Sequence, residues 1–107
     1  MKNKAKNELG IFIKPPNLEI IECCGILEID FVIIDMEHVP LSPRDLYPLV
    51  IAAERWRLKL IVRLPKLNEE YFKWCLDLGI SYLQVPQVET VSDVENAIKY
   101  SYFKSIW

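Results

Sequence analysis

The sequence predicts an α/β fold in which four consecutive βα units form a parallel sheet. Four short apolar runs among the 107 residues are near-continuous in Ile, Val, Leu and Phe, a composition typical of strands that are buried on both faces of a parallel sheet. A segment with helical periodicity follows each run. The runs occupy residues 9–13, 31–34, 60–62 and 82–85. Successive strands therefore start roughly 20 to 30 residues apart, the βα repeat length of barrels and doubly wound sheets.

The first two helices are predicted from their caps and their apolar spacing. Asn17 is a suitable N-cap for the first helix, although Gly25 inside it costs about 1 kcal/mol of helix propensity. Ser42 is a suitable N-cap for the second helix, with Pro43 and Asp45 in its first turn. The apolar side chains expected to pack are Ile20, Ile21, Cys24 and Leu27 in the first helix, and Leu46, Leu49, Val50 and Ala53 in the second.

The last two helices carry similar signals. The third is expected to start at Asn68 and to stop at Gly79, because glycine suits the left-handed position after a helix end. The fourth is predicted to open on residues 92–95, where Ser92 and Glu95 have the spacing of a capping box. The apolar positions expected to pack are Phe72, Cys75 and Leu76 in the third helix, and Val94, Ala97 and Ile98 in the fourth.

Composition excludes several classes of protein. With 13 basic and 15 acidic residues the formal net charge is -2, and the absence of a basic stripe argues against a nucleic-acid partner. Three cysteines and one histidine give neither a disulfide framework nor a structural zinc site. No apolar run is long enough for a signal peptide or a membrane span, so we expect a cytoplasmic protein without a membrane partner. No glycine-rich phosphate loop occurs.

The length predicts one domain, which we assign to residues 9–107, after a polar amino-terminal extension at residues 1–8. A complete (β/α)₈ barrel needs roughly 200 residues or more. The chain is too short to contain one.

Polar side chains follow the predicted strands, at the edge where ligands bind in parallel α/β folds. Asp35, Glu37 and His38 follow the second strand, and Arg63 ends the third. A histidine beside carboxylates is a competent general base, and an arginine can bind a substrate carboxylate or an enolate oxygen. The alternatives are that His38 is a partly exposed turn residue and that Arg63 forms an ion pair with Asp35 or Glu37. Asp77 opposes the dipole at a helix end, so it needs a partner, either a lysine or a catalytic histidine.

One of these segments carries a specific resemblance. Residues 31–42, FVIIDMEHVPLS, resemble the second-strand signature of the HpcH/HpaI aldolase family, an I-D-x-E-H-x-P run. Four further segments resemble that family in order and spacing: residues 9–14 (LGIFIK), 61–65 (IVRLP), 75–79 (CLDLG) and 85–88 (VPQV). Glu28 departs from the family pattern, because it stands before the second strand where the family usually has glycine.

The resemblance implies a site and a reaction. The family comprises (β/α)₈-barrel class II aldolases that use Mg²⁺ or Mn²⁺ and cleave 4-hydroxy-2-oxo acids to pyruvate or a related oxo acid plus an aldehyde. His38 matches the catalytic base, Arg63 the arginine that binds the oxo acid and stabilises the enolate, and Asp77 the carboxylate that raises the basicity of the histidine. Asp35 and Glu37 match acidic residues of the signature, with supporting roles at the metal-bound water and at the rim of the barrel.

The resemblance also implies that the chain is the amino-terminal half of a TIM (β/α)₈ barrel. The family's metal ligands, a glutamate and an aspartate, lie on later strands beyond Trp107, so we expect no tight metal binding and little or no activity from the chain alone. The alternative function is a non-catalytic remnant or split-barrel half that acts only through a partner chain. Two unpaired sheet edges would favour self-association or binding of a complementary carboxyl-terminal half. A flavodoxin-like binding domain is disfavoured because no phosphate loop follows the first strand.

Overall fold

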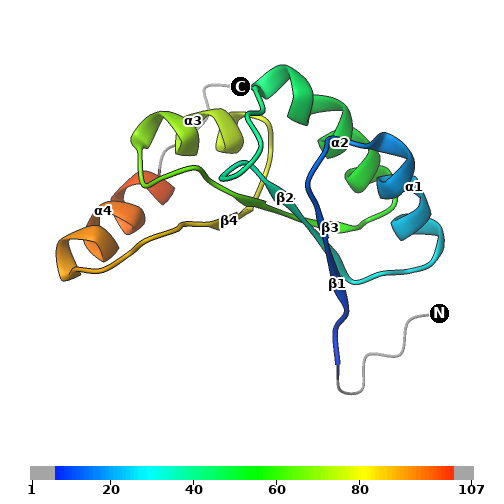
Figure 1. Ribbon diagram of the computed structural model, residues 1–107, viewed down its shortest axis with the longest axis horizontal. Helices are drawn as coiled ribbons and strands as arrows, with labels where there is room; N and C mark the ends of the chain where they lie inside the picture. Colours follow the sequence, from blue (N-terminus) through cyan, green and yellow to red (C-terminus); the bar gives the residue numbers. More distant parts are fainter. Residues whose placement is uncertain (1–6, 103–107) are drawn as a thin grey trace.

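The computed structural model describes residues 7–102, in which four parallel strands alternate with four helices (Figure 1). The sheet order is β1-β2-β3-β4, and every neighbouring pair is parallel. The predicted α/β fold of four βα units is therefore confirmed. The elements are β1 (Gly10–Ile13), α1 (Leu18–Ile26), β2 (Phe31–Asp35), α2 (Pro43–Arg55), β3 (Lys59–Arg63), α3 (Glu69–Asp77), β4 (Tyr82–Gln84) and α4 (Val91–Ser101).

The helices cover only one face of the sheet. Figure 1 shows α1, α2 and α3 on the same side of the strands, with α4 beyond β4. On the covered face, Val32, Ile34 and Val62 are fully buried. On the opposite face, Phe12 and Tyr82 keep about half of their surface exposed, at 50% and 48%. The expectation that the strands are buried on both faces is therefore wrong for the described residues.

The core lies between the sheet and the three covering helices. Its helical side chains include Ile21 and Cys24 of α1, Leu46 and Leu49 of α2, and Phe72 and Cys75 of α3, all almost completely buried. No helix among residues 7–102 is long and apolar enough to span a membrane. Residues 1–6 of the expected amino-terminal extension, and residues 103–107 of the expected domain, lie outside the described part of the chain.

Gly25 lies inside α1 because the ring of Trp56 packs against it. A Cβ atom at this position would come within 2.2 Å of the Trp56 ring. The indole N–H of Trp56 donates a hydrogen bond to Glu22 of α1, which holds the ring in place. Glycine lowers the helix propensity at position 25, but it allows α1 and the end of α2 to pack closely.

The amino-terminal caps confirm three of the four predicted helix starts. The side chain of Asn17 accepts from the N–H of Ile20, and that of Asn68 accepts from the N–H of Glu70. The N–H of Ser42 donates to the carboxylate of Asp45 at 2.9 Å.

The fourth helix starts differently, because the N-cap of α4 is Thr90 and not Ser92. The hydroxyl of Thr90 accepts from the N–H of Asp93 at 3.0 Å, and the carboxylate of Asp93 accepts from the N–H of Thr90 at 3.1 Å. This T-x-x-D box occupies the position that the S-x-x-E pattern at residues 92–95 was expected to fill, so the predicted capping box is wrong.

Three helices end in the same way. After α1, α2 and α3, the chain passes through a left-handed residue: Glu28 (φ 58), Arg57 (φ 54) and Gly79 (φ 88). The N–H of the following residue then bonds back across the last turn, as in Ile80 N–H to the carbonyl of Cys75 at 3.0 Å. This is the Schellman motif, and only its third example has the glycine that the motif prefers. It turns each chain segment sharply from a helix into the next strand.

Candidate active site

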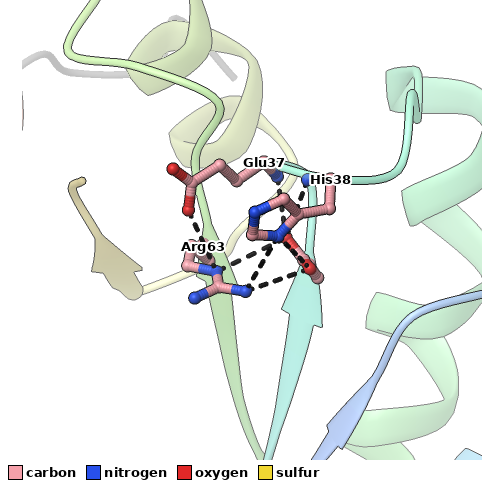
Figure 2. Close-up of polar contacts among 4 residues, drawn as sticks. Glu37, His38 and Arg63 are labelled. Atoms are coloured by element: carbon pink, nitrogen blue, oxygen red, sulfur yellow. Dashed lines mark hydrogen bonds and ion pairs between the residues drawn. The ribbon is translucent and has the colours of Figure 1, made fainter. Parts of the chain in front are cut away.

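The structure brings four of the five predicted site residues together at the carboxyl ends of β2 and β3 (Figure 2). Asp35 is the last residue of β2 and Arg63 the last of β3, and the two are direct partners in the parallel register. Glu37 and His38 follow Asp35 in the loop that leads to α2. These four residues are called the rim cluster below.

Asp35 is the centre of the rim cluster. Its side chain is fully buried, yet it accepts five hydrogen bonds. The backbone N–H groups of Glu37 and His38 donate to Oδ1 at 2.9 and 3.1 Å. Two side-chain donors, His38 Nδ1 at 2.9 Å and an Arg63 terminal nitrogen at 3.0 Å, reach Oδ2. The loop conformation and the positions of both cationic side chains therefore depend on one carboxylate.

These contacts keep Asp35 ionised. Burial alone would raise the pKa of the carboxyl group, but the hydrogen bonds from Arg63, His38 and the two backbone N–H groups outweigh it and hold the pKa well below its usual range. In the same pair, the hydrogen bond to Asp35 raises the pKa of Arg63. No buried side-chain nitrogen or oxygen among the described residues lacks a hydrogen-bond partner. The buried charge is thus fully compensated.

His38 is held by one ring nitrogen and exposes the other. Because ionised Asp35 only accepts, the proton on this side belongs on Nδ1, and in the neutral form of the ring Nε2 then has a free electron pair. An Arg63 nitrogen also lies 3.2 Å from Nδ1, but Nδ1 cannot accept from it while it donates to Asp35. The histidine side chain is 58% exposed, and its second ring nitrogen makes none of the contacts drawn in Figure 2.

Arg63 pairs with two carboxylates. In addition to Asp35, its Nε lies 3.5 Å from Glu37 Oε1, so the expected ion pairs at the rim are both present. The guanidinium also lies over the ring of Phe12, 4.9 Å from the ring centroid. The remaining terminal nitrogen makes none of the contacts drawn in Figure 2, and the side chain is 21% exposed. That nitrogen is available to an anionic ligand.

Phe12 was not among the predicted site residues. It belongs to an apolar run that was assigned to the core as a whole. The signal that identifies it is strand alternation: the register pairs Phe12 with Ile33 and Ile33 with Ile61, which puts Phe12 on the same face as Arg63, two positions from the rim.

The structure does not bring Asp77 to His38. Asp77 is the exposed last residue of α3, and the chain continues from it into β4 at Tyr82. It therefore lies toward the amino ends of the strands, whereas His38 follows the carboxyl end of β2. Within the described residues, the side chain of Asp77 has no hydrogen bond or ion pair. The carboxylate partner of His38 is Asp35.

The described residues do not fit a divalent metal ion. Residues 7–102 contain no group of three or more His, Cys, Asp or Glu side chains placed to hold one. Mg²⁺ and Mn²⁺ prefer several oxygen ligands, but both oxygens of Asp35 are engaged by N–H donors and Glu37 is paired with Arg63. The Mg²⁺ or Mn²⁺ that the resemblance implies would need ligands from outside this cluster.

An apolar groove adjoins His38. It has a volume of about 370 Å³ and lies between the loop after β2 and the first turns of α3. Tyr71 and Trp74 form an edge-to-face pair beside it, with ring centroids 5.5 Å apart. Its lining residues are Met36, Glu37, His38, Pro40, Leu41, Pro65, Tyr71 and Trp74.

Comparison with known proteins shows to which family the chain belongs. The family model described as HpcH/HpaI aldolase/citrate lyase matches residues 8–105. The chain is 30% identical over 103 residues to a 2-dehydro-3,6-dideoxy-6-sulfogluconate aldolase from Pseudomonas putida, covering 94% of this chain and 40% of that protein. It is 23% identical to a 2-keto-3-deoxy-L-rhamnonate aldolase from Klebsiella pneumoniae, covering 96% and 39%.

Two solved structures show the same fold. The structure of the citrate synthase SbnG superposes with a TM-score of 0.82 at 32% identity, covering 94% of this chain and 42% of that one. An HpcH/HpaI aldolase/citrate lyase family protein from Burkholderia cenocepacia gives 0.84 at 27% identity, covering 94% and 40%. The chain spans about 40% of the length of the curated relatives it matches. From residue 8 to residue 105 it belongs to the HpcH/HpaI aldolase/citrate lyase family.

Proposed function

We propose that the rim cluster is the base and the anion-binding arginine of an aldolase site for 4-hydroxy-2-oxo acids, which releases pyruvate or a related oxo acid plus an aldehyde. The observation that carries the proposal is the Asp35–His38–Arg63 network, in which one buried carboxylate orients both a base and a cation. The relatives named above as aldolases support the same reaction class.

His38 is the base of this reaction. In the cleavage direction, its Nε2 takes the proton of the 4-hydroxyl group, directly or through one water molecule, and the bond between C3 and C4 breaks. The electron pair of that bond passes to the enolate of the oxo acid, which is later protonated at C3. Ionised Asp35 favours this step because it stabilises the positive charge that His38 acquires.

Arg63 binds the oxo acid and stabilises the enolate oxygen through its free N–H groups. With Asp35 and Glu37 ionised, the three charged side chains sum to a net charge of about -1 when His38 is neutral. An anionic substrate is therefore repelled until Glu37 moves away or a further cation is present. This charge balance supports the requirement for a divalent cation held by residues outside the cluster.

The aldehyde side of the substrate would occupy the groove beside His38. Its lining is mostly apolar and aromatic, so it favours an aldehyde whose tail is uncharged.

The test is complementation. The 107-residue chain is co-expressed with the part of the Pseudomonas putida relative that this chain does not match, and pyruvate release from a 4-hydroxy-2-oxo acid is measured with and without Mg²⁺ or Mn²⁺. We expect release only from the pair. His38→Gln and Arg63→Lys should lower it at least 100-fold, while Arg55→Lys, on the exposed end of α2, should leave it unchanged.

Two results would contradict the proposal in different ways. Robust metal-dependent release by the 107-residue chain alone would show that no outside ligands are needed. A purified complex without activity would instead favour the second candidate, a non-catalytic remnant or split half that acts only through association. That candidate is supported by the uncovered face of the sheet, where Phe12 and Tyr82 are exposed.

A further inference from the structure

The two ends of the sheet are open. β1 and β4 each have a single strand neighbour among the described residues, so each leaves one row of backbone N–H and C=O groups without a strand partner. Such edges are templates for pairing with another strand.

The end at β4 also exposes an apolar helix face. Val91, Val94 and Ile98 of α4 and its C-cap Tyr102 lie at helical spacing and are 77%, 46%, 52% and 76% exposed. No residue of α4 is buried, whereas α1, α2 and α3 each bury at least two side chains. A helix in a βα unit covers its own strand and the strand that follows. The apolar face of α4 is therefore available to a strand that pairs with β4.

The end at β1 has the complementary shape. An apolar groove of about 370 Å³ lies between β1 and α1. Ile11 and Ile20 are 37% and 36% exposed there, and Leu27 is 72% exposed. The groove is lined by Ile11, Asn17, Glu19, Ile20, Cys23, Cys24, Leu27 and Ile29. An apolar helix laid beside β1 would cover it.

We propose that a second copy of this chain covers both ends. β4 of one copy pairs in parallel with β1 of the other, and the apolar face of α4 packs into the groove between β1 and α1 of the other copy. A two-fold axis repeats this contact, so neither end is left open. Four strands from each copy make eight, the number at which a parallel sheet closes into a barrel whose interior is filled by side chains.

Closure would bury the face of the sheet that the helices leave uncovered. Phe12 and Tyr82, about half exposed in one copy, then point into the barrel with the half-buried Ile33 and Ile61. All strands remain parallel, so the two rim clusters lie at the same end of the barrel. The assembly does not depend on any activity at that end.

The first test is the mass of the 107-residue chain in solution by sedimentation equilibrium. We expect a dimer of about 25 kDa, twice the 12.6 kDa of one chain. Ile98→Glu on α4 and Ile20→Glu in the groove should each weaken the dimer by about 100-fold or more, because each places a charge in both symmetry-related contacts. Ile51→Glu is the matched control, since Ile51 is 51% exposed on α2, away from both ends. Circular dichroism shows that each variant is folded.

Mixing the two variants tests the pairing of unlike ends. A mixed dimer of I98E and I20E has one intact contact, whereas each variant alone has none. We expect the mixture to dimerise more tightly than either variant. The proposal would be overturned if I98E, I20E and their mixture all dimerised equally weakly. It would also be overturned if I98E dimerised as tightly as the wild type.

The native thiols give a test that needs no variant. Cys23 is exposed and lies in the groove, whereas Cys24 and Cys75 are buried, and burial raises the pKa of both, to about 12 for Cys75. Modification of Cys23 should slow several-fold as protein concentration passes into the dimer range. A rate independent of concentration, a monomer at all concentrations, or open chains larger than a dimer would overturn the proposal. A monomer that binds the unmatched part of the Pseudomonas putida relative would show that a complementary half is the occupant instead.

Discussion

Asp35→Asn is the most informative single change, because five hydrogen bonds converge on this carboxylate. The amide oxygen of asparagine can still accept from the backbone N–H groups of Glu37 and His38. Its NH₂ group, however, would face His38 Nδ1 and the Arg63 terminal nitrogen, which now lie 2.9 and 3.0 Å from Oδ2. Two charge-assisted hydrogen bonds, each contributing about 1.5 to 3 kcal/mol, are removed, although His38 can still accept a neutral hydrogen bond from the amide at Nδ1. Arg63 keeps its ion pair with Glu37 and its contact with solvent, so the lower end of this range applies to each bond. The free energy of unfolding should therefore fall by about 3 kcal/mol.

The assay is urea unfolding followed by tryptophan fluorescence, at one protein concentration and at several pH values. Because the pKa of Asp35 is lowered on folding, its contribution to the free energy of unfolding is complete above the unfolded pKa of about 4. It is lost as pH falls below that value toward the folded pKa. The difference between wild type and Asp35→Asn should therefore shrink as pH falls below about 4.

Asp77→Asn is the matched control for this experiment. Asp77 is exposed at the end of α3, where a negative charge opposes the helix dipole, so the change should alter stability by about 0.5 kcal/mol or less. The reasoning about Asp35 fails if its variant is within about 0.5 kcal/mol of wild type, or if the difference grows as pH falls below about 4.

Three further changes test the packing and the helix ends. Gly25→Ala should lower stability by about 1 to 3 kcal/mol despite its higher helix propensity, because its Cβ would clash with the Trp56 ring; an unchanged melting temperature would contradict this packing. Thr90→Val should remove the cap of α4 and cost about 1 kcal/mol, seen as faster amide exchange in the first turn of α4 and not elsewhere. Arg57→Gly should raise stability by about 1 kcal/mol because φ at this position is 54°; a lower melting temperature would show that the side chain contributes more than the strain.

The order and type of the elements could be predicted because each apolar run and each helical stripe is local in the sequence. The helix ends were harder to predict. The glycine at position 79 predicts a residue in the left-handed conformation. Glu28 and Arg57 adopt the same conformation although neither is a glycine. There the turn is imposed by the following apolar residue, Ile29 or Leu58 (6% exposed), which leads the chain back to the sheet. Here the packing of the fold imposes the backbone conformation, and the local sequence propensity does not show it.

The burial of the strands was overestimated for a related reason. Near-continuous apolar runs predict strands covered on both faces, and the sequence of β1 or β3 does not show whether a second layer is present. Phe12 is as apolar as Ile13, yet the first is half exposed and the second is buried. The difference depends on which side of the sheet the helices occupy.

The residues of the rim cluster could be predicted from the sequence, but the network of hydrogen bonds between them could not. Strand ends in a parallel sheet converge, so Asp35, His38 and Arg63 could be placed at one edge from the sequence. The sequence did not show which carboxylate contacts His38. Asp35 lies three residues before His38, a spacing at which a carboxylate can bond both the backbone and the side chain of the following turn. The structure shows that it does both.

The hydrogen bonds of Asp35 explain why the rim cluster by itself does not fit a divalent metal ion. A carboxylate that accepts five hydrogen bonds, two of them from the half-buried Arg63, cannot also bind a cation without losing bonds that hold the loop with His38. Glu37 is the only other rim carboxylate among the described residues that could move, and one carboxylate does not hold Mg²⁺ or Mn²⁺ tightly. Asp35 therefore organises the base and the arginine. A metal ion at this rim would have to be held by ligands from outside the rim cluster.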